Sequence, residues 1–228
     1  PLHPRAHLAR VEVMLPLPDF QLSRPRTVEE AAALLAEGGR ALAGGTDLLP
    51  NLKHGADRAE HLVALWDIEE LQQPLGALQT LRAVGDTVPA LRACTRSVAT
   101  STIQRMGTLG GNLLLDTRCR WFNQSSFWRG ALPHGPCLKC EGGHHCYVAP
   151  RGEGCYAAHS SDTLPVLTLL EAQVELASIR GRRRLAVSAL SERADDELLV
   201  RVILPPTLPR VVFRKLRTRA AIDYGLLL

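Results

Sequence analysis

The chain has 228 residues, of which 46% are hydrophobic and 22% charged, with a formal net charge of +4. A chain of this length buries a substantial core, as one large domain or two small ones. No apolar run approaches the roughly 20 residues that cross a bilayer, so we expect no membrane span. Basic residues are spread along the chain, so we expect no nucleic-acid partner. A run at 180–184 is the exception and indicates a solvated turn between two strands, or alternatively a phosphate contact.

The first predicted elements are a helix, a strand and a glycine turn. Residues 27–30, Thr-Val-Glu-Glu, have the form of a capping box, and a Gly-Gly pair at 38–39 supplies a stop. Together they predict a short helix over residues 28–37. The apolar run 40–43 then predicts a buried strand that leads directly into Gly-Gly-Thr-Asp at 44–47.

The remaining predicted elements alternate between strands and helices. Strands are expected at 61–67, 81–84, 173–178, 198–204 and 211–217. A helix over 90–103 ends before a second glycine turn at 107–112, and a buried helix over 162–172 is capped by Ser161 or Asp162. This order predicts a mixed α+β chain, with a cysteine-rich segment inserted between the second glycine turn and the later helix.

Five of the six cysteines fall within residues 119–155. They are Cys119, Cys137, Cys140, Cys146 and Cys155. Thiolate sulfur is the soft donor that holds iron-sulfur clusters or zinc. The first ten residues lack the charged-then-apolar order of a signal peptide, so we expect a cytoplasmic location, where thiols act as ligands more often than as disulfides. The spacing alone leaves iron-sulfur and zinc open, because the last four cysteines, or a set with His144 or His145, could bind zinc.

Two glycine turns, within residues 42–49 and 108–112, suit a phosphate ligand. Paired glycines let the backbone approach a ligand closely, and adjacent Thr, Asp and Asn side chains add hydrogen bonds. Neither turn has the spacing of a Rossmann fingerprint or of a P-loop. A single Gly-Gly pair is most often only a tight turn, so the two turns together suggest a pyrophosphate site without identifying it.

Four motifs in combination resemble the FAD-binding medium subunit of the xanthine oxidase family of molybdenum hydroxylases. They are Leu-Ala-Gly-Gly-Thr-Asp-Leu-Leu-Pro-Asn (42–51), Thr-Leu-Gly-Gly-Asn-Leu (108–113), Ser-Asp-x-x-Pro-Val-Leu (161–167) and Phe-x-Lys-Leu (213–216). The resemblance implies an α+β FAD-binding fold of the PCMH or vanillyl-alcohol-oxidase type. It implies an N-terminal α/β FAD-binding subdomain over 1–70 and a second one over 71–217, with 218–228 as the start of a C-terminal subdomain that is cut short.

The cysteine-rich insertion, residues 116–158, resembles the β subunit of 4-hydroxybenzoyl-CoA reductase, in which an extra loop carries a [4Fe-4S] cluster. By that resemblance Cys119, Cys137, Cys146 and Cys155 are the cluster ligands. Cys140 departs from the pattern and is expected to be a spare thiol.

The resemblance also implies the flavin contacts. The first pyrophosphate-binding segment is Leu42, Ala43, Gly44, Gly45, Thr46, Asp47, Leu48 and Leu49, and the second contains Thr108, Gly110, Gly111 and Asn112. Asp162, Lys215 and Thr102 are implied as further FAD contacts. From the residues alone, Asp162 is equally a plain helix N-cap and Lys215 an ordinary strand lysine.

A flavin and an iron-sulfur cluster without an acid-base pair describe an electron-transfer oxidoreductase subunit that has no catalytic residue of its own. The resemblance implies a heterotrimer, which can dimerise, with a molybdopterin catalytic subunit and a [2Fe-2S] small subunit. It implies ferredoxin or a similar partner as the external donor, and removal of the phenolic hydroxyl of an aromatic acyl-CoA such as 4-hydroxybenzoyl-CoA. The alternatives are a molybdenum hydroxylase that uses NAD or a quinone, and an FAD subunit with a structural zinc loop.

Overall fold

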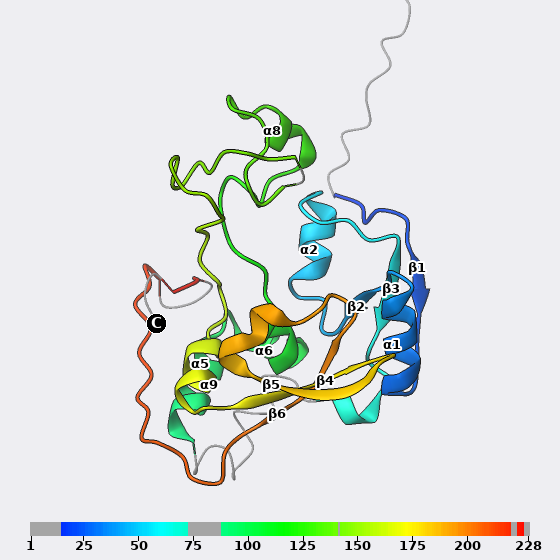
Figure 1. Ribbon diagram of the computed structural model, residues 1–228, viewed down its shortest axis with the longest axis vertical. Coiled ribbons are helices and arrows are strands. Elements are labelled where there is room, and N and C mark those ends of the chain that lie inside the picture. Colours follow the sequence, from blue (N-terminus) through cyan, green and yellow to red (C-terminus); the bar gives the residue numbers. More distant parts are fainter. Residues whose placement is uncertain (1–14, 73–87, 141, 220–222, 226–228) are drawn as a thin grey trace, which may run out of the picture.

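The computed structural model describes residues 15–72, 88–140, 142–219 and 223–225. Two three-stranded sheets organise the chain (Figure 1). The first is parallel and contains β1 (Gln21–Ser23), β2 (Arg40–Leu42) and β3 (His61–Ala64) in the order β1-β3-β2. The second is antiparallel and contains β4 (Gln173–Ser178), β5 (Gly181–Ala186) and β6 (Leu198–Ile203) in the order β5-β4-β6. The mixed α+β class expected from the sequence is confirmed.

Helix α1 (Val28–Ala36) confirms the capping-box prediction. The Thr27 hydroxyl oxygen accepts a hydrogen bond from the Glu30 amide at 3.1 Å, and the Glu30 carboxylate accepts one from the Arg26 amide at 2.8 Å. These bonds satisfy amide groups that have no partner at a helix start. A Cβ on Gly39 would lie 2.7 Å from the Leu34 carbonyl oxygen, so the return into β2 requires glycine.

Eight further helices lie in the described residues. They are α2 (Leu48–Lys53), α5 (Pro89–Ser97), α6 (Ser101–Met106), α7 (Leu109–Leu113), α8 (Ser126–Gly130), α9 (Leu164–Leu169) and the 3-10 helices η1 (Glu69–Leu71) and η2 (Val187–Glu192). The single helix predicted over 90–103 is wrong, because Ala99 has a positive φ of 39° and separates α5 from α6. The Thr100 hydroxyl then caps α6 by accepting from the Ile103 amide.

Only some of the predicted strands are present in the structure. Those at 61–67, 173–178 and 198–204 are confirmed as β3, β4 and β6, whereas 81–84 lies outside the described residues and 211–217 forms no strand. The arginine run at 180–184 begins in the exposed turn that joins β4 to β5, as expected, but most of it belongs to β5 itself. Arg182 is held there by ion pairs to Glu175 at 3.1 Å and Glu70 at 3.0 Å. Charged side chains on such an outer strand discourage further strand pairing.

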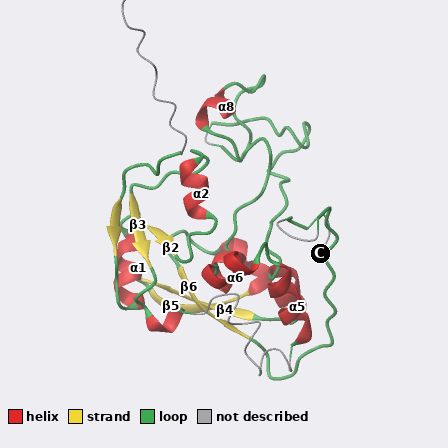
Figure 2. Cartoon of the chain, turned by 180° about the vertical axis from the view of Figure 1, so that it is seen from behind, coloured by secondary structure: helices red, strands yellow, loops and turns green. Residues whose placement is uncertain are grey.

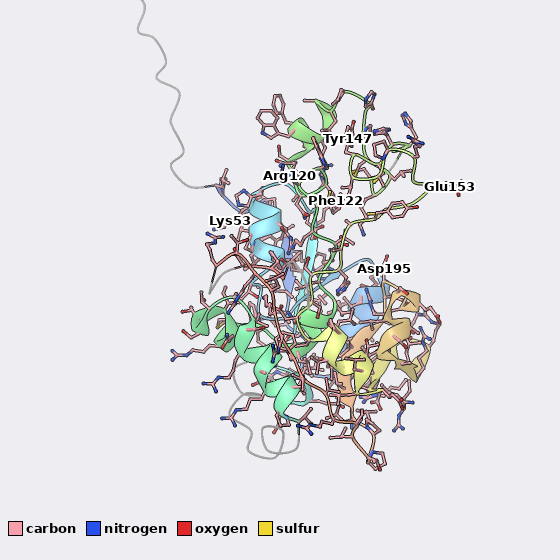
Figure 3. All side chains as sticks on the ribbon, turned by 90° about the vertical axis from the view of Figure 1, so that its left-hand side faces the viewer. Lys53, Arg120, Phe122, Tyr147, Glu153 and Asp195 are labelled. Atoms are coloured by element: carbon pink, nitrogen blue, oxygen red, sulfur yellow. The ribbon has the colours of Figure 1, made fainter. Side chains whose placement is uncertain are left out.

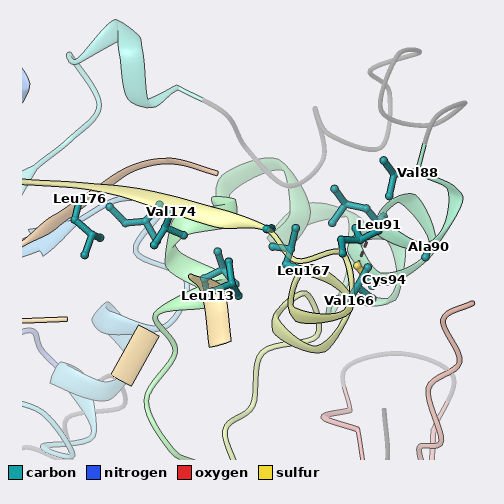
Figure 4. Packing of buried hydrophobic residues seen from close by; sticks show 13 residues of the cluster. Val88, Ala90, Leu91, Cys94, Leu113, Val166, Leu167, Val174 and Leu176 are labelled. Carbon is teal, nitrogen blue, oxygen red and sulfur yellow. Dashed lines mark hydrogen bonds between the residues drawn. The ribbon is translucent and has the colours of Figure 1, made fainter. Parts of the chain in front are cut away.

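The main core lies between the antiparallel sheet and helices α5, α7 and α9. Figure 4 shows Leu113 of α7 between Val174 of β4 and Leu167 of α9, and all three side chains are fully buried. Burying one such side chain contributes about 1.5 to 3 kcal/mol. Helix α1 packs through Ala31 against the other face of the antiparallel sheet, so the two sheets are joined by apolar contacts.

The cysteine loop, defined here as residues 116–158, leaves the body between α7 and α9 and carries α8 (Figure 1). An isolated bridge between Thr117 and His159 closes its base. Figure 2 shows α2 between the parallel sheet and this loop. Within the described residues, no helix is both long enough and apolar enough to span a membrane.

Candidate functional site

A cavity of about 1990 Å³ lies where the two glycine turns meet. Its walls include residues 43–48 of the first turn, residues 105–116 around the second, and Asp162. The base of the cysteine loop closes one end, through Phe122, Asn123 and Lys139. The cavity is larger than the roughly 300 to 1,000 Å³ of drug-sized ligand sites, so it suits an extended ligand.

Gly44 brings the two turns into direct backbone contact. A Cβ at this position would lie 1.8 Å from the carbonyl oxygen of Met106, at the end of α6. Only glycine permits this approach. The next residue, Gly45, has a positive φ of 67°, which also favours glycine. The Gly-Gly pair at 44–45 is therefore required both for a close approach and for a backbone turn.

Asp47 links the first turn to the cysteine loop. Its carboxylate accepts a hydrogen bond from the Asn51 side-chain amide at 3.1 Å and forms an ion pair with Arg118. Arg118 also donates to the Asn51 side-chain oxygen at 3.4 Å. Sequence reasoning missed Arg118, since no local motif marks it; its only signal was its position next to Cys119.

Asn112 anchors the second turn through its side chain. Thr108 caps α7, because its hydroxyl accepts a hydrogen bond from the Gly111 amide at 3.0 Å. The buried Asn112 side-chain oxygen accepts from the Ser161 hydroxyl at 2.9 Å and the Thr163 hydroxyl at 2.7 Å. Asn112 therefore fastens the turn to the start of α9, which no single motif in the sequence revealed.

Asp162 and Lys215, predicted separately, form a buried ion pair with 2.8 Å between Oδ1 and Nζ. Their side chains are only 6% and 3% exposed. Burial raises the pKa of Asp162, while the Lys215 ammonium acts in the opposite direction. Burial also raises the pKa of nearby Cys94 to about 12, with the Asp162 charge adding to the effect. Ser161, and not Asp162, accepts a hydrogen bond from the α9 amide of Leu164.

Eleven of the fifteen predicted flavin residues line the large cavity, and the other four lie elsewhere. Those that line the large cavity are Ala43, Gly44, Gly45, Thr46, Asp47, Leu48, Thr108, Gly110, Gly111, Asn112 and Asp162. Leu42 is buried in a small apolar cluster, and Leu49 packs against it. Thr102 lies exposed on α6. Lys215 reaches the cavity wall only through its ion pair with Asp162.

The four cysteines predicted as cluster ligands all line a second, smaller cavity. Cys119, Cys137, Cys146 and Cys155 share it with Trp121 and Tyr147, among others, whereas Cys140 does not line it. Its volume is about 20 Å³, room for about one water molecule. Among the described residues, no three His, Cys, Asp or Glu side chains form a group that could hold a metal ion. The structure gathers the predicted sulfurs around one space without bringing them to ligand distance.

Two of the loop thiols have distinct environments. The Cys146 sulfur accepts a hydrogen bond from the Ala149 amide at 3.3 Å, and this bond lowers its pKa. The Cys140 sulfur lies 3.6 Å from that of Cys137, and burial together with this neighbour raises the Cys140 pKa. A lowered pKa favours the thiolate form that binds metals, so Cys146 is better prepared than Cys140 for ligation.

Comparison with known proteins gives a family match over most of the chain. Residues 18–207 match the family described as FAD binding domain in molybdopterin dehydrogenase. The aldehyde oxidoreductase FAD-binding subunit PaoB of Escherichia coli is 30% identical, over 91% of this chain and 75% of that protein. The carbon monoxide dehydrogenase medium chain of Afipia carboxidovorans is 34% identical, over 41% of this chain and 38% of that protein.

The fold has counterparts among solved structures. Quinoline 2-oxidoreductase from Pseudomonas putida 86 matches with a TM-score of 0.68 at 22% identity, covering 92% of this chain and 67% of that chain. This likeness agrees with the PCMH-like α+β fold expected from the four motifs. The chain belongs to the FAD-binding domain family of the molybdopterin dehydrogenases and is an oxidoreductase FAD subunit of the molybdenum hydroxylase type.

Proposed function

We propose that this chain relays electrons between an external partner and a molybdenum subunit, using FAD in the large cavity and a [4Fe-4S] cluster in the cysteine loop. The observation that carries the proposal is the placement of Cys119, Cys137, Cys146 and Cys155 around one small cavity, which shares wall residues with the large one. FAD exchanges electrons in pairs or singly, and an iron-sulfur cluster exchanges them one at a time.

The body supplies the flavin site. The backbone of the two glycine turns would hold the pyrophosphate, because Gly44 brings both turns to one place and Asn112 fixes the second. The Asp162–Lys215 pair would present a carboxylate to the cavity while its buried ammonium balances the charge. Leu42, Leu49 and Thr102 lie outside the cavity walls and would act on the flavin indirectly or not at all.

Apolar burial does not hold the cysteine loop together, so the loop requires another stabilising group, and a metal cluster is one. Among its described residues only Cys137 and Cys146 are buried, and its cysteines are free thiols. A segment too small to build an apolar core usually requires a metal or disulfides for its fold. Since the cavity holds about one water, the loop segments have to move apart to admit a cluster.

The substrate and partners are proposed by resemblance, because substrate choice lies in a separate chain. The relatives include proteins named as subunits of aldehyde oxidoreductase, xanthine dehydrogenase and caffeine dehydrogenase. We propose a cytoplasmic heterotrimer with a molybdopterin subunit and a [2Fe-2S] subunit, which takes electrons from a ferredoxin-like donor to dehydroxylate an aromatic acyl-CoA such as 4-hydroxybenzoyl-CoA. A hydroxylase that passes electrons to NAD or a quinone is the alternative.

The proposed domains follow the same division. Residues 1–70 would form the first FAD-binding subdomain and residues 71–217 the second, with 116–158 as the cluster loop and 218–228 as the start of a further subdomain. The described core supports close association of the first two, because α1 packs on β4 and β6.

Anaerobic purification of the complex, followed by FAD, iron and sulfide quantitation, tests this proposal. We expect a paramagnetic signal from this chain after dithionite reduction. Cys146→Ser should abolish the signal and leave FAD bound, while the matched variant Cys140→Ser should retain both. Bound FAD without iron or acid-labile sulfide in this chain would refute the cluster.

A structural zinc site is the second candidate, and the 3.6 Å separation of the Cys137 and Cys140 sulfurs favours it. Cysteines separated by two residues are frequent zinc ligands. Cys146 and Cys155 would complete the set. In that case metal analysis would find zinc without sulfide, and Cys140→Ser would lose the metal.

A further inference from the structure

Two side chains belong to both cavities. Phe122 and Lys139 line the large cavity beside the glycine turns, and the same two side chains line the small cavity formed by the four cysteines. No other described residue lines both. Figure 3 shows Phe122 on the side of the cysteine loop that faces the body, below Tyr147. Phe122 and Lys139 are therefore the described residues that adjoin both cavities.

Several contacts fix this wall. The Phe122 amide donates to the Cys119 carbonyl oxygen at 3.1 Å, which fixes the Phe122 backbone to that of the first cysteine. The Lys139 ammonium lies 5.7 Å from the centroid of the Phe122 ring, within the range of a cation–π contact. The guanidinium of Arg129 lies 5.6 Å from the same centroid. The ring is thus held among positive groups and a cysteine backbone.

The charge at the wall is unequal on its two sides. Lys139 forms an ion pair with Asp116 at 2.7 Å, and Asp116 lines only the large cavity. The Asp116 carboxylate therefore lies on the side of the large cavity, whereas Lys139 lines both cavities. A fixed positive charge near a redox group favours its reduced, more negative form, and this effect decreases with distance and with exposure to water.

We propose that Phe122 and Lys139 form the partition between the two cofactor sites, with the Phe122 ring excluding water and the Lys139 charge favouring reduction on both sides. The identity of the two cofactors rests on the proposed function, whereas the geometry of the shared wall is independent of it. Both side chains are positioning residues, because they act on the cofactors without exchanging electrons or protons themselves.

The charge is tested with Lys139→Met, which keeps most of the side-chain stem, against Lys53→Met as the matched control. Lys53 is exposed on α2 and lines neither cavity (Figure 3). In reductive titrations of the purified complex, followed by flavin absorbance and paramagnetic resonance, Lys139→Met should disfavour reduction about threefold to tenfold, where tenfold equals about 59 mV for one electron. The shift should be larger at the cluster. Equal potentials in Lys139→Met and Lys53→Met would overturn the electrostatic role.

The barrier is tested with Phe122→Ala against Phe127→Ala, whose side chain is 73% exposed and lines neither cavity. The readout is the rate at which iodoacetamide alkylates the two buried loop thiols, Cys137 and Cys146, in metal-free protein that retains FAD. Phe122→Ala should raise this rate severalfold, and Phe127→Ala should leave it unchanged. Equal rates in the two variants would overturn the partition, provided that circular dichroism shows both folded.

These measurements separate the partition from the proposed function. Absence of iron and sulfide from the wild-type chain would refute the cluster. The flavin potential of Lys139→Met and the thiol rates of Phe122→Ala would still decide whether the wall exists.

Discussion

The α/β body and the cysteine loop are held together by different forces. In the body, Leu113, Leu167 and Leu176 are fully buried in one continuous apolar cluster. In the loop, only Cys137 and Cys146 are buried among the described residues. Apolar burial is the dominant stabilising force in folding. The body can therefore fold by its own packing, whereas the loop needs polar anchors and, as proposed, a metal.

The loop contacts the body through arginines. Arg118 reaches Asp47 of the first glycine turn, and Arg129 donates to the carbonyl oxygens of Gly55 and Ala56 at 3.4 Å. Both anchors lie on or next to α2, which begins directly after that turn. The position of the loop relative to the large cavity is therefore fixed by polar contacts, which tolerate movement better than a packed core does.

Breaking the buried ion pair should cause the largest loss of stability in the body. Lys215→Met leaves the Asp162 carboxylate buried without a counter-charge, which should lower the free energy of unfolding by about 3 to 5 kcal/mol. Denaturant unfolding monitored by circular dichroism measures it. The exposed Lys53→Met serves as the control, and equal stability of the two variants would contradict the role given to the pair.

The same variant has a predictable pH dependence. Burial raises the folded-state pKa of Asp162 above its ordinary value of 3.8, and Lys215 opposes that shift. The native state therefore binds this proton more tightly than the unfolded state, and the contribution of the group to stability falls as pH rises above 3.8. Without Lys215 the pKa rises further, so the deficit of Lys215→Met should be smallest in acid and grow toward neutral pH. A stability deficit of Lys215→Met that grows toward acidic pH would contradict this account of the ion pair.

Gly44→Ala should cause a smaller loss of stability and a clear loss of affinity for FAD. The added Cβ would lie 1.8 Å from the Met106 carbonyl oxygen, so the two glycine turns have to separate. We expect a cost of about 1 to 3 kcal/mol and at least tenfold weaker FAD binding, which corresponds to about 1.4 kcal/mol. Fluorescence titration of the flavin-free protein measures the affinity.

Gly130→Ala is the control in the loop, because a Cβ there meets no atom within 4 Å. It should leave both stability and FAD affinity unchanged. If Gly130→Ala weakened FAD binding as much as Gly44→Ala does, the close approach of the two turns would not be the cause.

An effect of about 1 kcal/mol is expected from removing the cap of α1. Thr27→Ala removes the hydroxyl that accepts from the Glu30 amide, and the loss of such caps costs about 0.5 to 2 kcal/mol. Thermal unfolding should show the decrease, and Thr27→Ser should restore most of the stability. A Thr27→Ser protein as unstable as Thr27→Ala would implicate the methyl group instead of the cap.

The smallest effect on global stability should come from the loop. The Tyr147 hydroxyl donates to the Gly135 carbonyl oxygen at 2.7 Å and accepts from the His134 amide at 3.0 Å. Tyr147→Phe removes both bonds, yet it should change the free energy of unfolding by less than about 0.5 kcal/mol, because the loop opens separately from the body.

Limited proteolysis should instead cleave within 116–158 several times faster in Tyr147→Phe than in the control Tyr156→Phe, whose ring is 59% exposed. A decrease of more than about 1 kcal/mol in the free energy of unfolding would show that the loop and the body unfold together. It would contradict the difference between the two regions.

Local signals explain which elements the sequence predicted. The capping box of α1, the buried strand β3 and the strands β4 and β6 each follow from propensity and pattern within a few residues. The interruption between α5 and α6 was missed because Ala99 carries no sequence signal for a positive φ. Strand β5 was missed because its arginines pair with carboxylates such as Glu70, far away in the sequence.

The chemical groups of each part of this protein can be read from its sequence: two glycine turns, clustered thiols, and an order of motifs that resembles FAD subunits. Which of these groups lie in contact is a property of the fold and could not be read from the sequence. The fold paired Asp162 with Lys215, placed the Gly44 backbone against Met106, and made Phe122 and Lys139 line both cavities. The physical reason is that a side chain's propensity acts over a few neighbouring residues, whereas packing and charge pairing join residues that the chain separates widely.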